Sequence, residues 1–262
     1  HVFTRELEDA EIPVIAPLQS LDGETLFHHG PFRFSIYPCR GGRPPELDNP
    51  EHLLQMGRFI GRIHAIGAQQ PYHSRPAIDL ESYLHGPRKF LMENQFIPMH
   101  LEAAYSSLTD VLVEQVQYCY ERAGQVASVR LHGDFHPGNV LWTDKGPHIV
   151  DFDDARNGPA VQDLWMFLSG DREYMQSMLG KLLQGYSQFY HFDPVELHLL
   201  EALRTMRMIY HAGWLASRWE DPAFPAAFPW FNSTDYWENH VLGLREQSAL
   251  MQEAPLIWER SS

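Results

Sequence analysis

Two aspartates and an asparagine flank a predicted β-hairpin, at positions where their side chains would meet. Val140–Trp142 and His148–Val150 are short apolar runs separated by an Asp-x-Gly turn, the pattern of a hairpin. Asn139 precedes the first run, Asp151 follows the second, and Asp134 lies on the loop that leads in. Because a hairpin brings its two ends together, we expect the three side chains to converge.

These residue types suit phosphoryl transfer. Carboxylate and amide oxygens are ligands that Mg²⁺ prefers, usually with substrate phosphates completing its shell. Two of the three groups would hold the metal on a nucleotide, and a third carboxylate would orient an acceptor hydroxyl and take its proton. Each aspartate alone would be read as a turn or cap residue; the prediction rests on the three together.

The elements before this hairpin divide into two unequal parts. Phe32–Tyr37 alternates, with Phe32, Phe34 and Ile36 on one face, which predicts a half-buried strand. The run from Pro38 to Pro45 is rich in Pro and Gly and interrupts regular structure. We interpret it as a hinge at 38–45, between a small part (1–37) and a large part (46–262).

The large part is predicted to be mostly helical. Apolar residues recur at helical spacing over 53–63 and over 101–119, and the second pattern stops at Gly124. Gly57 and Gly61 lie within the first pattern and predict close packing against a neighbouring helix.

A further helix is predicted after residue 193. Asp193 and Pro194 look like an N-cap and the first helical position, and the helix should run to about Trp219. The segment 220–237 is rich in Pro and aromatic residues, and we expect irregular structure there.

Composition excludes several classes of partner. The 262 residues include 20 basic and 34 acidic side chains, a formal charge of −14. Coating nucleic acid or an anionic membrane needs a basic excess, so we expect neither partner. No apolar run approaches the roughly 20 residues of a membrane helix, and no leader is visible. Two cysteines, Cys39 and Cys119, are too few for a disulfide framework, so we expect a cytoplasmic protein.

The motifs resemble a known family. His132–Asn139 followed by Ile149–Asp154 resembles the catalytic segment of the aminoglycoside phosphotransferase and choline kinase branch of the protein-kinase-like fold. The segments 57–64, 153–166 and 219–237 extend the resemblance over nearly the whole chain, to bacterial cytoplasmic Ser/Thr protein kinases of that branch that act in stress response. The resemblance implies an α+β, two-lobe fold: a small N-lobe, incomplete in this chain, and a mostly helical C-lobe carrying the catalytic β-hairpin.

The resemblance also implies roles for the site residues. Asp134 would be the proton acceptor, and Asn139 and Asp151 the Mg²⁺ ligands, with Asp151 counted among the catalytic residues. The hinge, through Pro38, Cys39 and Arg40, would offer backbone groups to the adenine of ATP.

Two supporting roles follow from the same resemblance. Asp163 would tie down the catalytic loop through backbone N–H groups, and an N-terminal helix cap is its alternative. His132 would orient the loop. Asp153 is either a second metal group or a solvated turn acid, and Arg156 is expected to form a surface ion pair.

The small lobe departs from the family pattern. Kinases place a Gly-rich phosphate loop and a strand Lys, paired with a helix Glu, before the hinge. The chain has three lysines, Lys89, Lys145 and Lys181, and all follow the hinge. We expect that the missing parts precede His1; the alternative is a pseudokinase that lacks them.

The predicted function is therefore an ATP- and Mg²⁺-dependent Ser/Thr protein kinase, a monomer that acts on protein substrates including itself. A small-molecule kinase of the aminoglycoside, choline or homoserine type uses the same machinery, and a non-catalytic ATP-binding pseudokinase also remains open. Two more distant alternatives are a haloacid-dehalogenase-like phosphatase using Asp151 and Asp153, and a metallohydrolase using His132, Asp134 and His136.

Overall fold

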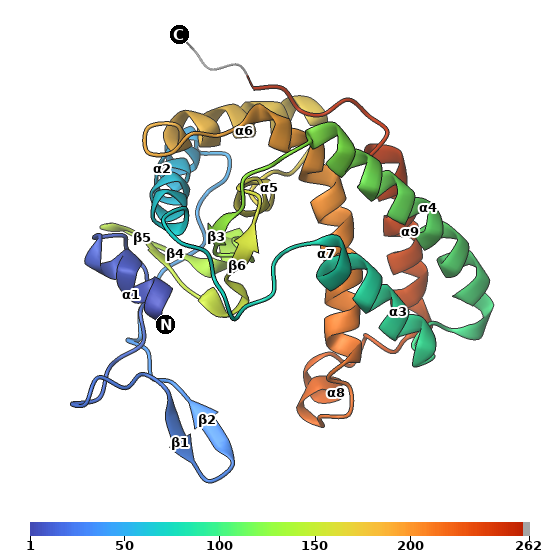
Figure 1. Cartoon of the computed structure of the whole chain (residues 1–262), viewed down its shortest axis with the longest axis horizontal. Coiled ribbons are helices and arrows are strands. Elements are labelled where there is room, and N and C mark those ends of the chain that lie inside the picture. Colours follow the sequence, from blue (N-terminus) through green and yellow to red (C-terminus); the bar gives the residue numbers. More distant parts are fainter. Residues whose placement is uncertain (259–262) are drawn as a thin grey trace. The chain divides into compact units, whose positions relative to one another are not determined.

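The computed structural model describes residues 1–258 and divides into two compact units (Figure 1). Of the described residues, the first unit comprises His1–Arg75, Ala127–Phe192 and Trp258, and the second comprises Pro76–Val126 and Asp193–Ile257. The predicted hinge at 38–45 lies inside the first unit, and the division of the chain into lobes there stays a prediction.

The first unit is held together by a pair of helices that cross at glycines. Its helices are α1 (Val2–Asp9), α2 (Pro50–Gly67), α5 (Gln162–Trp165) and α6 (Arg172–Tyr186). A Cβ at Gly57 would lie 1.9 Å from the Leu182 carbonyl oxygen, and one at Gly61 would lie 2.5 Å from that of Tyr186. Backbone therefore touches backbone between α2 and α6, which confirms the predicted close packing.

Three two-stranded ladders complete the first unit. They are β1 (Phe27–His29) with β2 (Phe32–Phe34), β3 (Val129–Leu131) with β6 (Arg156–Gly158), and β4 (Val140–Thr143) with β5 (Gly146–Ile149), all antiparallel. In the last pair Val140 lies opposite Ile149 and Thr143 opposite Gly146. The predicted hairpin and its turn are confirmed.

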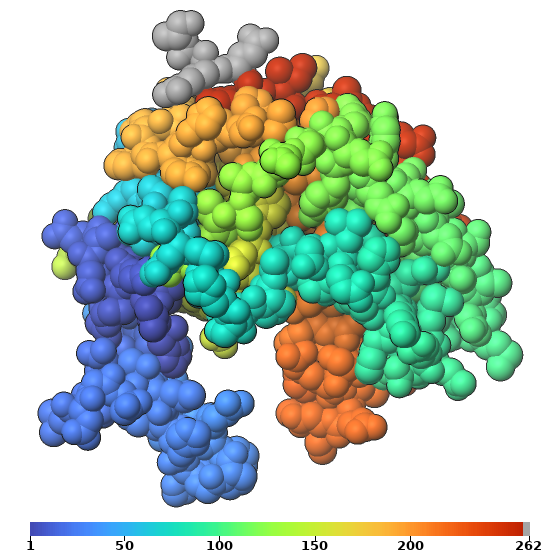
Figure 2. Space-filling view, in the orientation of Figure 1, coloured from blue at the N-terminus to red at the C-terminus, as the bar shows by residue number. Residues whose placement is uncertain are grey.

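The prediction of a half-buried strand over Phe32–Tyr37 is wrong. Strand β2 ends at Phe34, and the side chains of Phe32, Phe34 and Ile36 are 70%, 44% and 50% exposed. Within the described residues β2 pairs only with β1, and Figure 2 shows this hairpin projecting from the rest of its unit. Alternation predicts which side chains share a face, but burial needs a second layer to cover that face.

The second unit is entirely helical in the described residues. Its elements are the π-helix η1 (Glu81–His85), the 3₁₀ helix η4 (Pro194–Leu199) and the α-helices α3 (Gly86–Glu93), α4 (Met99–Ala123), α7 (Leu200–Ala216), α8 (Ala223–Ala227) and α9 (Thr234–Leu250). Helix α4 ends at Gly124, whose φ of 67° is the left-handed conformation that favours glycine, as predicted.

The predicted helix after Asp193 begins as a 3₁₀ turn. Asp193 caps it by accepting from the Val195 N–H (3.1 Å), and α-helical geometry starts at Leu200. The helix ends at Ala216, three residues before the predicted end at Trp219.

The expectation of irregular structure throughout 220–237 is wrong at two places. Helix α8 occupies Ala223–Ala227, and α9 begins at Thr234 after the Ser233 side chain accepts from the Tyr236 N–H (3.2 Å). The last proline of the segment, Pro229, precedes this cap, so nothing after it interrupts the helix. In residues 1–258 no helix is both long and apolar enough to span a membrane.

Candidate active site

The hairpin β4–β5 brings Asn139 and Asp151 to the same end. The Val150 N–H donates to the Asn139 carbonyl oxygen (3.0 Å), one position beyond the Val140–Ile149 pair. Asp151 is the next residue along the chain. The backbone therefore places these two residues as neighbours across the open end of the hairpin, as the sequence predicted.

Asn139 also fixes the loop that carries Asp134. Its side-chain amide donates to the Asp134 carbonyl oxygen (2.9 Å), so the loop closes on the start of the hairpin. The Asp134 carboxylate is half-buried, with Oδ2 lying 3.8 Å from His136 Nε2. With the amide nitrogen of Asn139 used in this bond, its oxygen Oδ1 is the atom that could meet a cation.

The backbone at Asp151 is in the left-handed conformation. Its φ is 65° and its ψ is 64°, which a non-glycine residue adopts at a cost of about 1–2 kcal/mol. The side chain is exposed. The chain therefore turns sharply at the residue that ends the hairpin and presents an acidic side chain there.

Asp163 anchors the backbone of the loop that carries Asp134. Its carboxylate accepts from the His132 N–H (2.8 Å) and the Gly133 N–H (2.9 Å). Gly133 has a φ of 87°, and a Cβ there would lie 2.2 Å from the Asp154 carbonyl oxygen, so the position requires glycine. Asp163 lies inside α5 rather than at its cap, and its predicted role as the tether of the loop is confirmed.

His64 is a supporting residue that the sequence analysis did not identify. The His64 Nε2 donates to Asp163 Oδ2 (3.0 Å), and its Nδ1 accepts from the Tyr186 hydroxyl (2.9 Å). All three side chains are buried. Its position one turn after Gly61 on the buried face of α2 was the available signal. The carboxylate is thus oriented by α2 as well as by the loop.

His132 and His136, the two histidines of this loop, each form a hydrogen bond with a backbone group. His132 Nε2 donates to the Val150 carbonyl oxygen (2.8 Å), and its ring stacks on Phe135 at 4.7 Å. His136 Nδ1 accepts from the Gly138 N–H (3.0 Å). Within residues 1–258 no three His, Cys, Asp or Glu side chains are grouped to hold a metal. The geometry therefore gives no support to the metallohydrolase alternative.

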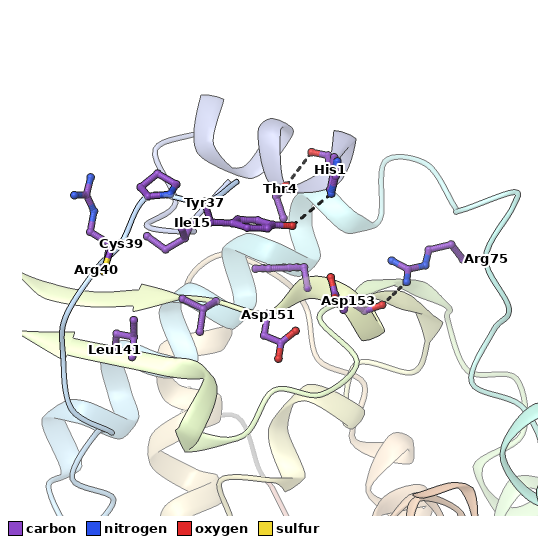
Figure 3. Close-up of a pocket in the computed structure, with 13 residues that line it drawn as sticks. His1, Thr4, Ile15, Tyr37, Cys39, Arg40, Arg75, Leu141, Asp151 and Asp153 are labelled. Carbon is purple, nitrogen blue, oxygen red and sulfur yellow. Dashed lines mark hydrogen bonds between the residues drawn. The ribbon is translucent and has the colours of Figure 1, made fainter. Parts of the chain in front are cut away.

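A cavity of about 540 Å³ lies in the first unit beside this hairpin (Figure 3). One end is formed by Pro38, Cys39 and Arg40, the start of the predicted hinge, with Tyr37 just before them, and Asp151 lies on the floor of the cavity. The cavity is further lined by Thr4 of α1, by Ile15 in the segment after α1, and by Leu141 and Val150 of the hairpin and its end. Asp134 and Asn139 are not among the residues that line it.

The hinge segment is fastened to the hairpin by its backbone. Arg43 exchanges two hydrogen bonds with Trp142, at 3.0 and 2.7 Å. A Cβ at Gly42 would lie 2.6 Å from the backbone of Leu141, so glycine permits this close approach. The Cys39 end of the cavity therefore has a fixed position relative to strand β4.

Charged groups of both signs line the cavity: Asp151 and Asp153 are acidic, and Arg40 and Arg75 are basic. The pKa of Tyr37 is raised by burial and then by the nearby carboxylates of Asp153 and Asp151, so its phenol stays neutral. Asp154 pairs with Arg156 (3.0 Å), so the ion pair expected for Arg156 is present, but the Arg156 side chain is only 11% exposed and does not lie on the surface as expected. Asp153 is exposed, and its carbonyl oxygen accepts from the Arg75 guanidinium.

Comparison with known proteins identifies the family. Residues 1–200 match the model of the phosphotransferase enzyme family. The chain is 43% identical to stress response kinase A of Salmonella choleraesuis and 44% identical to that of Escherichia coli K12, in each case over 98% of this chain and 77% of the relative. A protein of Salmonella typhimurium, 43% identical over the same share, is called serine/threonine protein kinase RdoA.

Solved structures show the same fold. An amicoumacin kinase in complex with AMP-PNP, Ca²⁺ and Ami aligns with a TM-score of 0.69 at 18% identity, over 97% of this chain and 77% of its own. A microcompartment-associated aminopropanol kinase aligns with a TM-score of 0.70 at 15% identity, over 96% and 78%. The fold is therefore the α+β protein-kinase-like fold of this branch.

The family match and the kinase-like fold identify a phosphotransferase. The chain belongs to the phosphotransferase enzyme family, within which it is an ATP-dependent kinase, and among its relatives are the bacterial stress response kinases.

Proposed function

We propose that the chain transfers the γ-phosphoryl group of Mg–ATP to Ser or Thr hydroxyls of proteins, itself included. One observation carries the proposal: a single cavity is lined both by the hinge residues Pro38–Arg40 and by Asp151, which neighbours Asn139 across the hairpin. A nucleotide with its adenine against the hinge would direct its phosphates toward Asp151.

The residues present fit a magnesium ion. Asn139 Oδ1 and the exposed Asp151 carboxylate are hard oxygen donors at adjacent backbone positions, and Mg²⁺ takes one or two such ligands with phosphate oxygens. The strained backbone of Asp151 is typical of a functional position. The ion would neutralise charge on the phosphates.

Asp134 would accept the proton of the acceptor hydroxyl. As that oxygen forms its bond to the γ-phosphorus, the bond to the β-γ bridging oxygen breaks, ADP leaves, and the hydroxyl proton passes to the Asp134 carboxylate. The loop geometry supports this role, because Asn139 and Asp163 hold the backbone on either side of Asp134. Positioning and charge neutralisation supply most of the catalysis in this reaction class.

The protein acceptor rests on the relatives' names. The curated relatives are called stress response and Ser/Thr protein kinases, whereas the solved neighbours are named for amicoumacin and aminopropanol. Identity of 43–44% over 98% of the chain favours the protein acceptor over a small alcohol. We also propose a cytoplasmic monomer acting in stress response, with lobes at 1–37 and 46–262 about the hinge at 38–45.

The test is phosphoryl transfer from γ-labelled ATP with Mg²⁺, using myelin basic protein and, separately, kanamycin, choline and homoserine. We expect acid-stable label on Ser or Thr of the added protein and of the enzyme. Asp134→Asn should lower turnover about 100-fold or more with an unchanged unfolding midpoint. Asp144→Asn, at the exposed turn of the same hairpin, is the control and should retain turnover.

Two results would overturn the proposal at different levels. Label on a small alcohol and on no protein would refute the protein acceptor. Wild-type-like turnover by Asp134→Asn would refute the assigned chemistry.

A further inference from the structure

Arg75 lines the cavity at the end opposite the hinge. In Figure 3 Arg40 lies at one end, Asp151 in the middle and Arg75 at the other end, with its guanidinium directed toward Asp153. A nucleotide held at Tyr37–Arg40, with its phosphates near Asp151, would extend its last phosphate toward Arg75.

The guanidinium of Arg75 is held in place on two sides. One Nη group donates to the Asp153 carbonyl oxygen, and the guanidinium carbon lies 5.8 Å from the centre of the Tyr72 ring. Burial raises the pKa of Tyr72 to about 12, so the ring stays neutral beside the cation.

The loop that carries Arg75 is itself anchored. Asn157, in strand β6, accepts from the Tyr72 N–H (2.9 Å) and donates to the Tyr72 carbonyl oxygen (2.8 Å). The Arg75 side chain is exposed, but Tyr72, three residues before it, is bonded to strand β6, which pairs with β3. Such an arrangement limits the entropy lost when the cation meets a ligand.

The positive charge of Arg75 could offset negative charge in the cavity. Asp151 and Asp153 lie between Arg40 and Arg75 and carry negative charge, and a triphosphate adds several more negative charges. Among the described lining residues the arginines are Arg40 and Arg75, and in Figure 3 the Arg40 side chain points away from Asp151. Arg75 is therefore the lining arginine on the side of the cavity where the terminal phosphate would lie.

We propose that Arg75 binds the terminal phosphate of ATP and is a further catalytic residue of this enzyme. The inference rests on the proposed function. A guanidinium offers several N–H donors in a planar fork that matches phosphate oxygens, and it stays charged throughout the reaction. It would neutralise charge on the transferring group without exchanging any atom with it.

The test compares Arg75→Gln and Arg75→Lys by calorimetric titration with ATP, ADP and adenosine in Mg²⁺, and by kcat and KM. We expect Arg75→Gln to weaken ATP binding about tenfold and to lower kcat about 100-fold or more, with adenosine affinity unchanged. The preference for ATP over ADP should shrink. Arg75→Lys should be intermediate, because it keeps the charge and loses the fork. Arg33→Gln, on exposed strand β2, is the control.

The outcomes separate the two proposals. If the wild type binds adenosine and ATP and transfers phosphate, but Arg75→Gln does so equally well, the role of Arg75 is refuted and the kinase function stands. Equal losses of adenosine and ATP affinity would mark Arg75 as structural and also refute it. A wild type that binds no adenine nucleotide would refute the proposed function itself, and the Arg75 role with it.

Discussion

Arg130 and Glu6 form an ion pair that fastens helix α1 to the strand leading into the catalytic loop. Arg130 Nη2 lies 2.6 Å from Glu6 Oε2, and the Arg130 side chain is 4% exposed while that of Glu6 is 29% exposed. The same guanidinium lies 4.4 Å from the centre of the Phe3 ring, and it donates to the Ile66 carbonyl oxygen (3.3 Å). Helices α1 and α2 and strand β3 thus share one buried cation.

Removing this cation should destabilise the first unit. We expect Arg130→Met to lower the free energy of unfolding by about 2 kcal/mol, less than for a fully buried pair because Glu6 keeps contact with water. Chemical denaturation followed by tryptophan fluorescence measures the change. Arg58→Met, which loses an exposed hydrogen bond to Gln188, should change stability by less than about 0.5 kcal/mol. Equal effects in the two variants would contradict the assigned importance of the pair.

The α2–α6 contact should not tolerate a methyl group. Gly57→Ala would place a Cβ 1.9 Å from the Leu182 carbonyl oxygen, and the helices would have to separate. We expect a loss of about 2 kcal/mol or more, measured as a lower unfolding midpoint. Gly180→Ala on α6, where a Cβ meets nothing within 4 Å, should instead stabilise by about 0.5–1 kcal/mol. A neutral Gly57→Ala would show that the helices approach less closely than described.

The tether at Asp163 should control the catalytic loop. In Asp163→Asn a side-chain amide replaces one oxygen, so at least one of the bonds from His132 N, Gly133 N or His64 is lost. We expect a loss of about 2 kcal/mol in stability and a fall in kcat of about tenfold or more, with a smaller change in KM for ATP. Steady-state kinetics and thermal unfolding measure these together.

Asp171→Asn is the matched control for this change. Asp171 also accepts a backbone N–H, from Tyr174 at 2.9 Å, but it does so at the exposed N-cap of α6, where asparagine caps equally well. Both kinetics and stability should stay at the wild-type level. If Asp163→Asn also kept its kcat, the loop would not depend on its tether.

His240 should make the stability of the second unit depend on pH. Burial, and then the charge of His211, lower the pKa of His240 to about 4 from its ordinary 6.5. Between these values the unfolded chain binds a proton that the folded chain does not, so stability falls as pH drops from about 6.5 and the loss is complete near 4. The slope should reach about 1.4 kcal/mol per pH unit.

His240→Phe should flatten this part of the pH profile, because the ring that must stay neutral is replaced by one that cannot ionise. Unfolding midpoints between pH 4 and 7 test the change. His100→Gln, which alters an exposed histidine of α4, should leave the slope in place. A slope that survives in His240→Phe would assign the titration to other groups.

Local patterns in the sequence predicted the elements that position the candidate site. The Asp-x-Gly turn between two apolar runs defined the hairpin and therefore the meeting of Asn139 with Asp151. The glycine spacing on α2 defined its packing, and family resemblance identified Asp163 as the tether. Each of these features depends on residues close in the chain or on a motif with fixed order.

Contacts between distant residues were not predictable in the same way. His64 meets Asp163 across 99 positions, and Arg130 meets Glu6 across 124. No periodicity links such pairs, because they depend on how complete elements pack. The prediction that the strand near Phe32–Phe34 is half-buried was wrong for the same reason. Alternation shows which side chains share a face of the strand, but not whether another layer of the protein covers that face.

The left-handed turn at Asp151 decides how that position should be studied. Aspartate, asparagine and glycine accept this conformation more readily than alanine does. An alanine there would remove the carboxylate and also favour a different path for the chain into the 3₁₀ helix η3 (Phe152–Asp154), so its effect would combine two causes. Asparagine keeps the left-handed backbone conformation while removing the negative charge. Comparing the two substitutions therefore separates the effect of the backbone conformation from the effect of losing a cation ligand.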